Sequence, residues 1–579
     1  MSVKEMDRDD WAMRPWLMAA LGAFAGLLIH LLWFKFLLIH FLTDSDKPGD
    51  LALAATAFVG AAGTLTAFTL ERIRWRWALI FSFCTAAVVA LVTYWNGSPE
   101  NWSAGGGWRA VCIALAVGIA APLFQAARDE GGRRFPYVAV HGHAWTNVVI
   151  WCAGMVFVGI VFALAYLLSA LFDLIGIRLL SNLLRQGWFG WMLAGAAFGA
   201  AIGLFRERDR IVGMLQRVVV SVLAVLAPVL GAGLLIFLVS LIFTGLTPLW
   251  EATKSTTPIL LGCVIGALIL ANAVIGNSDE EESRFAPLRF GAIALAVAML
   301  PFAIIAAVST GARIGQYGLT PDRLWAVVFV AIAIAYGAAY WWALARRRLD
   351  WAAAVRPANL LLAFGLCGVA LILSTPLISF NALSTRDQVA RIKRGAIPAD
   401  KIDWAALAFE FGGPGKAAVR DLAKTGTPPV RMAAAKALKA DNRWHLAGMA
   451  ETSRKADRAR KSVIVLPRPV PLPEGLLESF GWQLPENART ARLLYHPGEH
   501  SAVLVVQSCS DCGPIVAVTR LDAKGAWKMP EDGPAVPASG KAFDAKALGE
   551  AIAAGRIDIR PVTRRQVFID GKPAGAVFD

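Results

Sequence analysis

The chain of 579 residues contains few charged residues and few cysteines. Aspartate, glutamate, lysine and arginine make up 17% of the sequence, whereas a typical soluble domain has about 25%. This shortage of charge, combined with 57% hydrophobic residues, excludes a soluble enzyme and an intrinsically disordered protein. Seven cysteines are too few for a secreted, disulfide-rich scaffold of this length. The composition is that of a membrane protein.

Long apolar runs occupy the first two-thirds of the chain. A helix needs about 20 apolar residues to cross a hydrocarbon core roughly 30 Å thick. The sequence predicts eleven such spans: Pro15–His40, Leu51–Leu70, Trp77–Trp95, Trp108–Ala126, Thr146–Ser169, Phe189–Phe205, Val218–Phe243, Pro258–Gly276, Leu288–Val308, Leu324–Ala345 and Asn359–Ser379. The first run is too long for a signal peptide, and no small-residue cleavage motif follows it. The expected fold class is therefore an all-α polytopic membrane bundle over residues 1–379.

The positions of lysine and arginine predict the orientation of this bundle. With the N-terminus inside, the inner segments hold nineteen basic residues and the outer loops hold seven. Positive residues prefer the cytoplasmic side of short loops. An odd number of spans then places everything after Ser379 outside, in the periplasm of a bacterial inner membrane.

The remaining residues predict a soluble region with two parts. Residues 380–465 are expected to be a helical periplasmic segment, and residues 466–488 a proline-rich linker. Residues 489–579 are expected to form a small α+β domain with a mostly antiparallel sheet. Its expected strands are Ala491–Tyr495, Ala502–Gln507, Ile515–Leu521, Asp558–Val562 and Gln566–Ile569, with a helix at Ala545–Ala554.

Two cysteines in this domain, Cys509 and Cys512, lie between two expected strands at a hairpin turn. A thioredoxin-type redox pair sits where a strand leads into a helix, but here a strand follows. Zinc would need two further ligands, for which His496 and His500 are candidates. The favoured interpretation is a local structural disulfide, since the periplasm is oxidising.

The outer loop between the ninth and tenth spans carries Arg313 and Arg323, against the positive-inside preference. Two glycines between them permit a tight turn, and Thr320 is a plausible N-cap for the next span. One interpretation is that the loop only caps a helix, with the arginines paired to carboxylates or lipid phosphate. The other is an anion-binding pocket in which the two guanidinium groups hold phosphate or carboxylate and Tyr317 forms a wall.

Three classes of function stay open. The first is a non-enzymatic envelope protein, either a permease or a scaffold that presents a periplasmic domain. The second is a transferase that uses a lipid-linked donor, with Asp44 and Asp46 of the first outer loop holding a divalent metal. The third is a periplasmic sensor. The first class is favoured, because the sequence contains no nucleotide-binding, zinc-protease or serine-hydrolase motif.

No catalytic residue, resident metal or cofactor is expected in this interpretation. The bilayer is the expected partner. Other envelope proteins or anionic envelope polymers are further candidates, and nucleic acid is not expected. The basic run Arg454–Lys461 is either a solvated face or a contact for anionic headgroups or polymers.

Several motifs resemble a known family of bacterial membrane proteins. They are Phe135-Pro-Tyr137, His141-Gly-His-Ala-Trp145, Leu171–Ile177, Phe243–Trp250, Asn272-Ala273 and Arg313–Arg323. They resemble the long proteobacterial members of the family catalogued as domain of unknown function 4153 (DUF4153). The resemblance covers most of residues 1–380 and extends to Asp403–Phe409. It implies an inner-membrane protein and supplies no catalytic residues.

Overall fold

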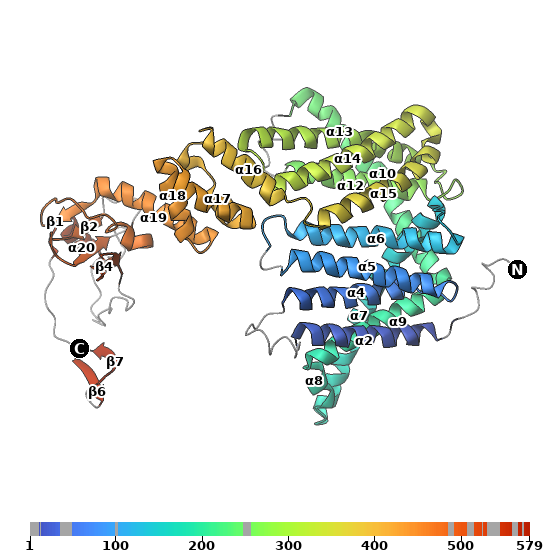
Figure 1. The fold of residues 1–579 in the computed structure, drawn as a ribbon, viewed down its shortest axis with the longest axis horizontal. Coiled ribbons are helices and arrows are strands. Elements are labelled where there is room, and N and C mark those ends of the chain that lie inside the picture. Colours follow the sequence, from blue (N-terminus) through green and yellow to red (C-terminus); the bar gives the residue numbers. More distant parts are fainter. Residues whose placement is uncertain are drawn as a thin grey trace. The chain divides into compact units, whose positions relative to one another are not determined.

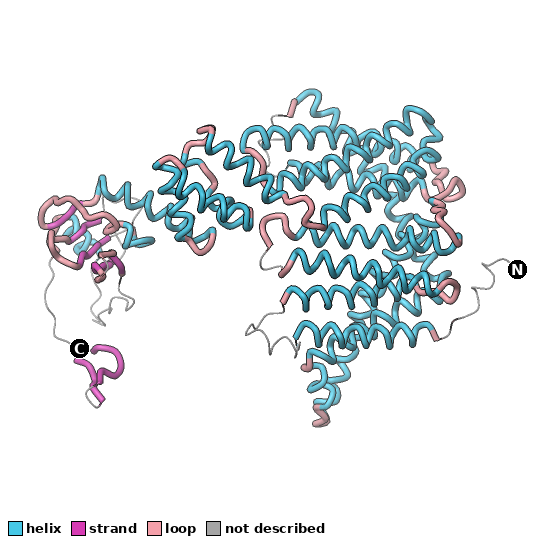
Figure 2. The backbone as a smooth tube through the Cα atoms, in the orientation of Figure 1, coloured by secondary structure: helices cyan, strands magenta, loops and turns pink. Residues whose placement is uncertain are grey.

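The computed structural model describes most of the chain. The described residues are 11, 13–34, 49–98, 102–246, 256–484, 491–506, 515–523, 525–529, 545–557, 565–569 and 572–578. They divide into two compact units, residues 1–434 and 435–579. In the described part of the chain, strands occur only after Ser462 (Figure 2).

The first unit contains eleven apolar helices among its described residues (Figure 1). They are α2 (Arg14–Phe34), α4 (Asp50–Thr69), α5 (Trp75–Asn96), α6 (Gly107–Glu130), α7 (Tyr137–Leu174), α9 (Gly187–Glu207), α10 (Asp209–Thr244), α12 (Thr256–Ile275), α13 (Ala286–Tyr317), α14 (Pro321–Arg347) and α15 (Trp351–Ser374). A short helix, α8 (Leu179–Leu184), lies between α7 and α9. Each expected span coincides with one of the eleven.

The last two helices form one continuous helical segment of 54 residues, Pro321–Ser374, in which a short turn separates α14 from α15. Arg348 has a φ of 48° at this turn, and the two helices pack against each other. Counted as continuous segments, ten helical stretches of the described chain are long and apolar enough to cross a membrane. Because α14 and α15 fold back on each other, this segment has the length and composition for two crossings.

The helices bury many small residues and expose many large apolar ones. The core around α12 and α13 contains fully buried alanines such as Ala267, Ala271 and Ala303. Conversely, Val229, Ile236 and Ile242 of α10 are at least 70% exposed. Close packing through small residues and an apolar outer surface are typical of helices in lipid. The fold is that of a multi-pass membrane protein.

Glycines allow α2 and α9 to pack with their backbones in contact. Gly22 and Gly26 on α2 repeat every four residues, as do Gly195 and Gly199 on α9. A Cβ atom at Gly195 would overlap the carbonyl oxygen of Gly22, and one at Gly199 would overlap that of Met18. Only glycine therefore permits this separation of the two helices.

The chain after α15 stays attached to the first unit through α16 (Phe380–Lys393), a short π-helical turn (Ala406–Glu410) and α17 (Gly412–Thr425). Asn381 of α16 bonds the Ser103 hydroxyl in the loop before α6. The backbone of Ala104 donates to the Glu410 carbonyl oxygen at 2.9 Å. We call this end of the bundle the α16 end, and the opposite end, where α4 finishes, the α4 end.

The second unit combines helices with a small mixed sheet. It begins within α18 (Pro428–Lys439) and continues with α19 (Arg443–Ser462). The sheet has the order β1 (Ile464–Leu466), β2 (Ala491–Leu494), β3 (Ser501–Val506), β4 (Ile515–Leu521) and β5 (Trp527–Lys528). Strand β1 is parallel to β2, and the other neighbours are antiparallel. Helix α20 (Ala545–Ala553) and a hairpin of β6 (Arg565–Ile569) and β7 (Lys572–Phe578) follow.

Residues 466–484, the described part of the predicted linker 466–488, supply much of this unit's core. Leu476, Leu477 and Phe480 are fully buried against Leu493 and Leu504 of the sheet. The prolines before them favour extended backbone, but a short 3-10 helix (Glu478–Gln483) follows and buries Phe480. This short stretch therefore contains both proline-rich residues and a buried helical turn.

Candidate functional site

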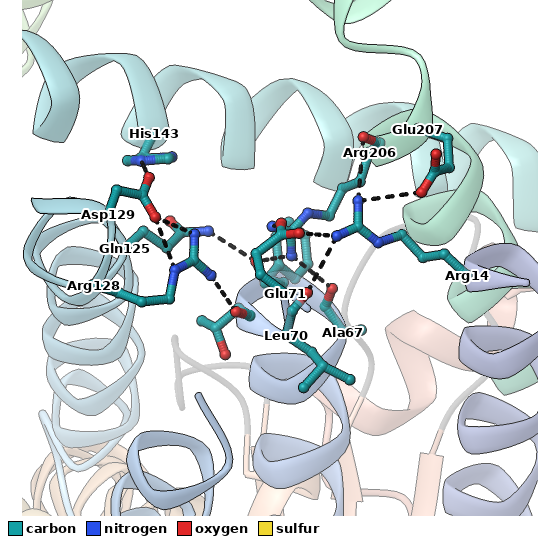
Figure 3. A network of polar contacts seen from close by, with 12 residues as sticks. Arg14, Ala67, Leu70, Glu71, Gln125, Arg128, Asp129, His143, Arg206 and Glu207 are labelled. Atoms are coloured by element: carbon teal, nitrogen blue, oxygen red, sulfur yellow. Dashed lines mark hydrogen bonds and ion pairs between the residues drawn. The ribbon is translucent and has the colours of Figure 1, made fainter. Parts of the chain in front are cut away.

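The C-terminal end of α4 is the centre of a polar network (Figure 3). The last four carbonyl groups of a helix have no partner within the helix. Here the carbonyl oxygens of residues 67–70 accept hydrogen bonds from side chains of three other helices. The donors are Arg14 of α2, Gln125 and Arg128 of α6, and Arg206 of α9.

One carboxylate joins two of these arginines. Glu71, directly after α4, pairs one oxygen with Arg14 and the other with Arg206 (Figure 3). The three side chains are between 8% and 14% exposed. Glu207 adds a second carboxylate 3.5 Å from Arg14. Buried charges of this kind are tolerated only when they are paired, so the cluster ties α2, α4 and α9 together.

A second branch of the network involves α6 and α7. Asp129 accepts from Arg128 at 2.6 Å and lies 2.9 Å from His143. Gln125 and Asn147 exchange hydrogen bonds between the same helices. We call the whole set the α4-end network: Arg14, Glu71, Gln125, Arg128, Asp129, His143, Asn147, Arg206 and Glu207. It borders a polar cavity of about 630 Å³.

A related arrangement caps the C-terminal end of α12. Arg356 of α15 donates to the Ile275 carbonyl oxygen at 2.9 Å and to that of Ser278 at 2.8 Å. It also pairs with Asp279 and, at 3.2 Å, with Glu282. An arginine from a later helix thus again binds the free carbonyl end of an earlier one, where a positive charge is favourable.

Next to Arg356, three polar side chains meet inside the bundle. The Tyr340 hydroxyl accepts from Asn272 at 2.8 Å and from Asn359 at 3.2 Å, and Asn359 donates to Asn272 at 2.8 Å. Tyr340 is fully buried. Asn272 of α12 thus makes interhelical hydrogen bonds to both α14 and α15.

The residues of the predicted anion-binding loop lie at the α16 end. Arg323 donates to the Gly318 carbonyl oxygen at 2.6 Å, and its guanidinium lies 5.4 Å from the centre of the Tyr317 ring. Arg313 is one turn before Tyr317 on α13. The Thr320 hydroxyl accepts from the backbone of Arg323 at 3.3 Å, which confirms the predicted N-cap. An anion pocket at this loop stays a prediction.

Helix α16 holds this loop in a way the sequence did not indicate. Asp387 accepts from the backbone N–H of Leu319 at 2.8 Å. Gln388 donates to the carbonyl oxygens of Tyr317 and Leu319, both at 3.0 Å. The turn between α13 and α14 is therefore fixed by a segment about 70 residues later in the chain.

The other predicted site residues fall outside the described residues. They are Asp44 and Asp46 of the first outer loop and Cys509 and Cys512. The strands on either side of the cysteine pair are β3 and β4, which are antiparallel neighbours with Val506 opposite Ile515. The predicted hairpin setting is thus present, and the disulfide stays a prediction.

Sequence reasoning missed the α4-end network because it counted its arginines only as topology signals. The sequence feature that could have indicated the network is an acidic residue beside basic ones at the end of an apolar run, as at Glu71 and at Arg128-Asp129. Such charges at helix ends also occur as solvated loop residues. Their partners come from distant spans, and nothing in the local pattern of residues connects them.

These features define a class of protein: a multi-pass membrane bundle with helix ends joined by arginine side chains, followed by a small mixed-sheet unit. A family comparison makes the assignment specific. The sequence model of the family described as Domain of unknown function (DUF4153) matches residues 16–408, more than half of the chain. The chain belongs to this family. Searches of curated proteins and of solved structures gave no match.

Proposed function

We propose that the chain is a rigid, non-enzymatic scaffold of the bacterial inner membrane, with its N-terminus in the cytoplasm and its C-terminal unit in the periplasm. The observation that supports a scaffold is the use of polar side chains at the α4 end. Arg14, Arg128 and Arg206 bind helix carbonyls and carboxylates that join four helices. A permease that moves these helices apart would have to break buried ion pairs in each cycle.

The orientation rests on the distribution of basic residues. Successive helices run in alternate directions, which assigns each connecting segment to one end of the bundle. The segments with most arginines all lie at the α4 end: 72–76, 128–134, 206–210 and 346–348. The loops of the α16 end contain fewer. The positive-inside preference assigns the α4 end to the cytoplasm and α16 to the periplasm.

Reporter fusions test this orientation. Alkaline phosphatase fused after Phe380 is expected to be active, and green fluorescent protein fused there is expected to be dark. Fusions after Gly132, in the α6–α7 loop of the α4 end, serve as the matched control and are expected to give the opposite pattern. Activity of alkaline phosphatase after Gly132 but not after Phe380 would contradict the proposed compartments.

A deletion strain tests the non-enzymatic role. Its envelope stress and its lipid and polysaccharide composition are measured against the parent. Altered envelope stress with unchanged chemical composition is expected for a scaffold. Loss of one specific glycan or lipid modification would instead favour a transferase, and Asp44→Ala and Asp46→Ala variants would then be assayed for that product.

A further inference from the structure

Two cavities meet beside α2 and α4. The first is the polar cavity of the α4-end network. The second is an apolar groove of about 760 Å³ between α2, α4 and α5. Trp11, Glu71 and Arg72 line both. The two cavities therefore adjoin at these three residues. Below, the polar cavity is called the charged end and the apolar groove the apolar body.

The apolar body is open to the side. Leu17, Leu21 and Phe24 of α2 line it and are 40%, 39% and 60% exposed. Along α2 the groove extends from Leu17 to Leu28, which corresponds to about 16 Å at roughly 1.5 Å per residue. Half of a hydrocarbon core of roughly 30 Å is about 15 Å. The groove thus has the length of one lipid leaflet.

The charged end carries an excess of arginine. Its described lining includes six arginines (Arg14, Arg72, Arg128, Arg206, Arg208 and Arg210) and three acidic residues (Glu71, Asp129 and Glu207). The network uses three of these arginines, whereas Arg72, Arg208 and Arg210 are exposed at the rim. The Nε atom of Arg14, a residue only 7% exposed, is buried without a hydrogen-bond partner among the described residues.

This combination fits one kind of molecule. Guanidinium groups match the geometry and charge of phosphate. Trp11, at the junction of the two spaces, is an aromatic residue of the kind enriched at the membrane–water interface, and Arg14 lies 5.0 Å from the centre of its ring. Basic pockets between membrane helices recognise anionic headgroups. A zwitterionic lipid would fill the groove but would not neutralise the arginines.

We propose that these two adjoining cavities together form a binding site for an anionic phospholipid, with the phosphate at Arg72, Arg208 and Arg210 and one acyl chain between α2, α4 and α5. Acyl-chain burial holds the lipid in the groove, and the arginines select its charge. Lipid binding at this site does not depend on which side of the membrane the α4 end faces. The experiment below therefore tests the site independently of the proposed orientation.

The test uses the full chain purified in detergent and native mass spectrometry with added phosphatidylglycerol, phosphatidylcholine or inorganic phosphate. Retention of phosphatidylglycerol in preference to phosphatidylcholine is expected. The triple variant Arg72→Gln, Arg208→Gln, Arg210→Gln is expected to weaken phosphatidylglycerol binding on the order of 100-fold, since each basic side chain near an anionic headgroup contributes roughly fivefold.

A matched control removes the same charge elsewhere. The triple variant Arg346→Gln, Arg347→Gln, Arg348→Gln changes exposed arginines at the end of α14, away from the cavity, and is expected to bind as the parent does. Thermal unfolding confirms that both variants are folded. Equal retention of the two lipids, equal loss in both triple variants, or binding of inorganic phosphate without lipid selectivity would overturn the proposal.

Discussion

Arginine closes the helix ends in this bundle because a single guanidinium donates to several acceptors at once. Arg206 contacts the carbonyl oxygens of Ala67 and Phe68 as well as the Glu71 carboxylate. Arg356 does the same for Ile275, Ser278 and an acidic loop. A lysine ammonium has no planar fork with which to span such acceptors. Arginine at these positions is therefore a matter of geometry as well as charge.

A substitution at Glu71 tests how much the negative charge of this carboxylate stabilises the fold. Glu71→Gln removes the charge that compensates Arg14 and Arg206 while keeping the size of the side chain. Breaking a buried ion pair costs about 3 to 5 kcal/mol, so the free energy of unfolding should fall by that order. Melting temperature in detergent and abundance in the membrane measure the effect. Glu130→Gln, an exposed carboxylate at the end of α6, is the control and should change neither.

Gly318 and Gly315 are expected to respond to alanine with opposite signs. Gly318 has φ 79° and ψ −174°, and a Cβ there would lie 2.6 Å from Gln388 and 2.7 Å from Asp387. Gly318→Ala should destabilise the turn and the docking of α16 by about 1 to 3 kcal/mol. Gly315 lies within α13 with nothing within 4 Å of such a Cβ, so Gly315→Ala should stabilise the helix by up to about 1 kcal/mol. The melting temperatures of the two variants are measured in the same detergent. Equal shifts for Gly318→Ala and Gly315→Ala would contradict the predicted difference between the two glycines.

At the level of elements, the sequence predicted all eleven long apolar helices of the described chain, because a long apolar run has few alternatives in lipid. It also predicted β2, β3, β4, β6 and α20 of the second unit, where alternation and turn residues agree. The predicted strand Asp558–Val562 lies outside the described residues. It did not predict which helices pair. The Gly22–Gly26 and Gly195–Gly199 repeats belong to helices separated by most of the first half of the bundle, and each repeat alone resembles ordinary small-residue composition.

The packing of α2 on α9 depends on these glycines. In Gly195→Ala, the new methyl group would meet backbone atoms of Gly22, which cannot rotate away. Overpacking of this kind costs about 1 to 3 kcal/mol, so lower membrane abundance and a lower melting temperature are expected. Gly190→Ala, on the same helix with nothing within 4 Å of the new atom, is the control. If both variants behave alike, the close approach of α2 and α9 does not stabilise the fold.

For the whole molecule, the sequence located the membrane region but not the connections that complete it. The donors to the α4 carbonyls come from residues 14, 125, 128 and 206, and those to the α13–α14 turn from α16. Hydropathy describes each span separately and carries no information about such partners. The candidate site is therefore a product of tertiary packing.

Truncation distinguishes the bundle from the parts attached to it. A chain ending after Gly426 keeps α16 and α17 and is expected to accumulate in the membrane like the full chain. A chain ending after Ser379 loses the bonds of Asn381, Asp387 and Gln388 and should accumulate less. Membrane fractionation and immunoblotting measure both. As a scaffold without its C-terminal unit, the longer truncation should fail to restore the deletion phenotype. Restoration would mean that the bundle alone carries the function.

The position of Arg206 in the chain also sets an order of assembly during synthesis. Arg14 and Glu71 emerge from the ribosome 192 and 135 residues before Arg206, the second arginine that pairs with Glu71. At roughly 5 to 20 residues per second, Glu71 at the end of α4 precedes Arg206 by about 7 to 27 s. The helix that packs against Gly22 and Gly26 of α2 is therefore the last of the three to be made, and the contact closes only after α9 has been synthesised.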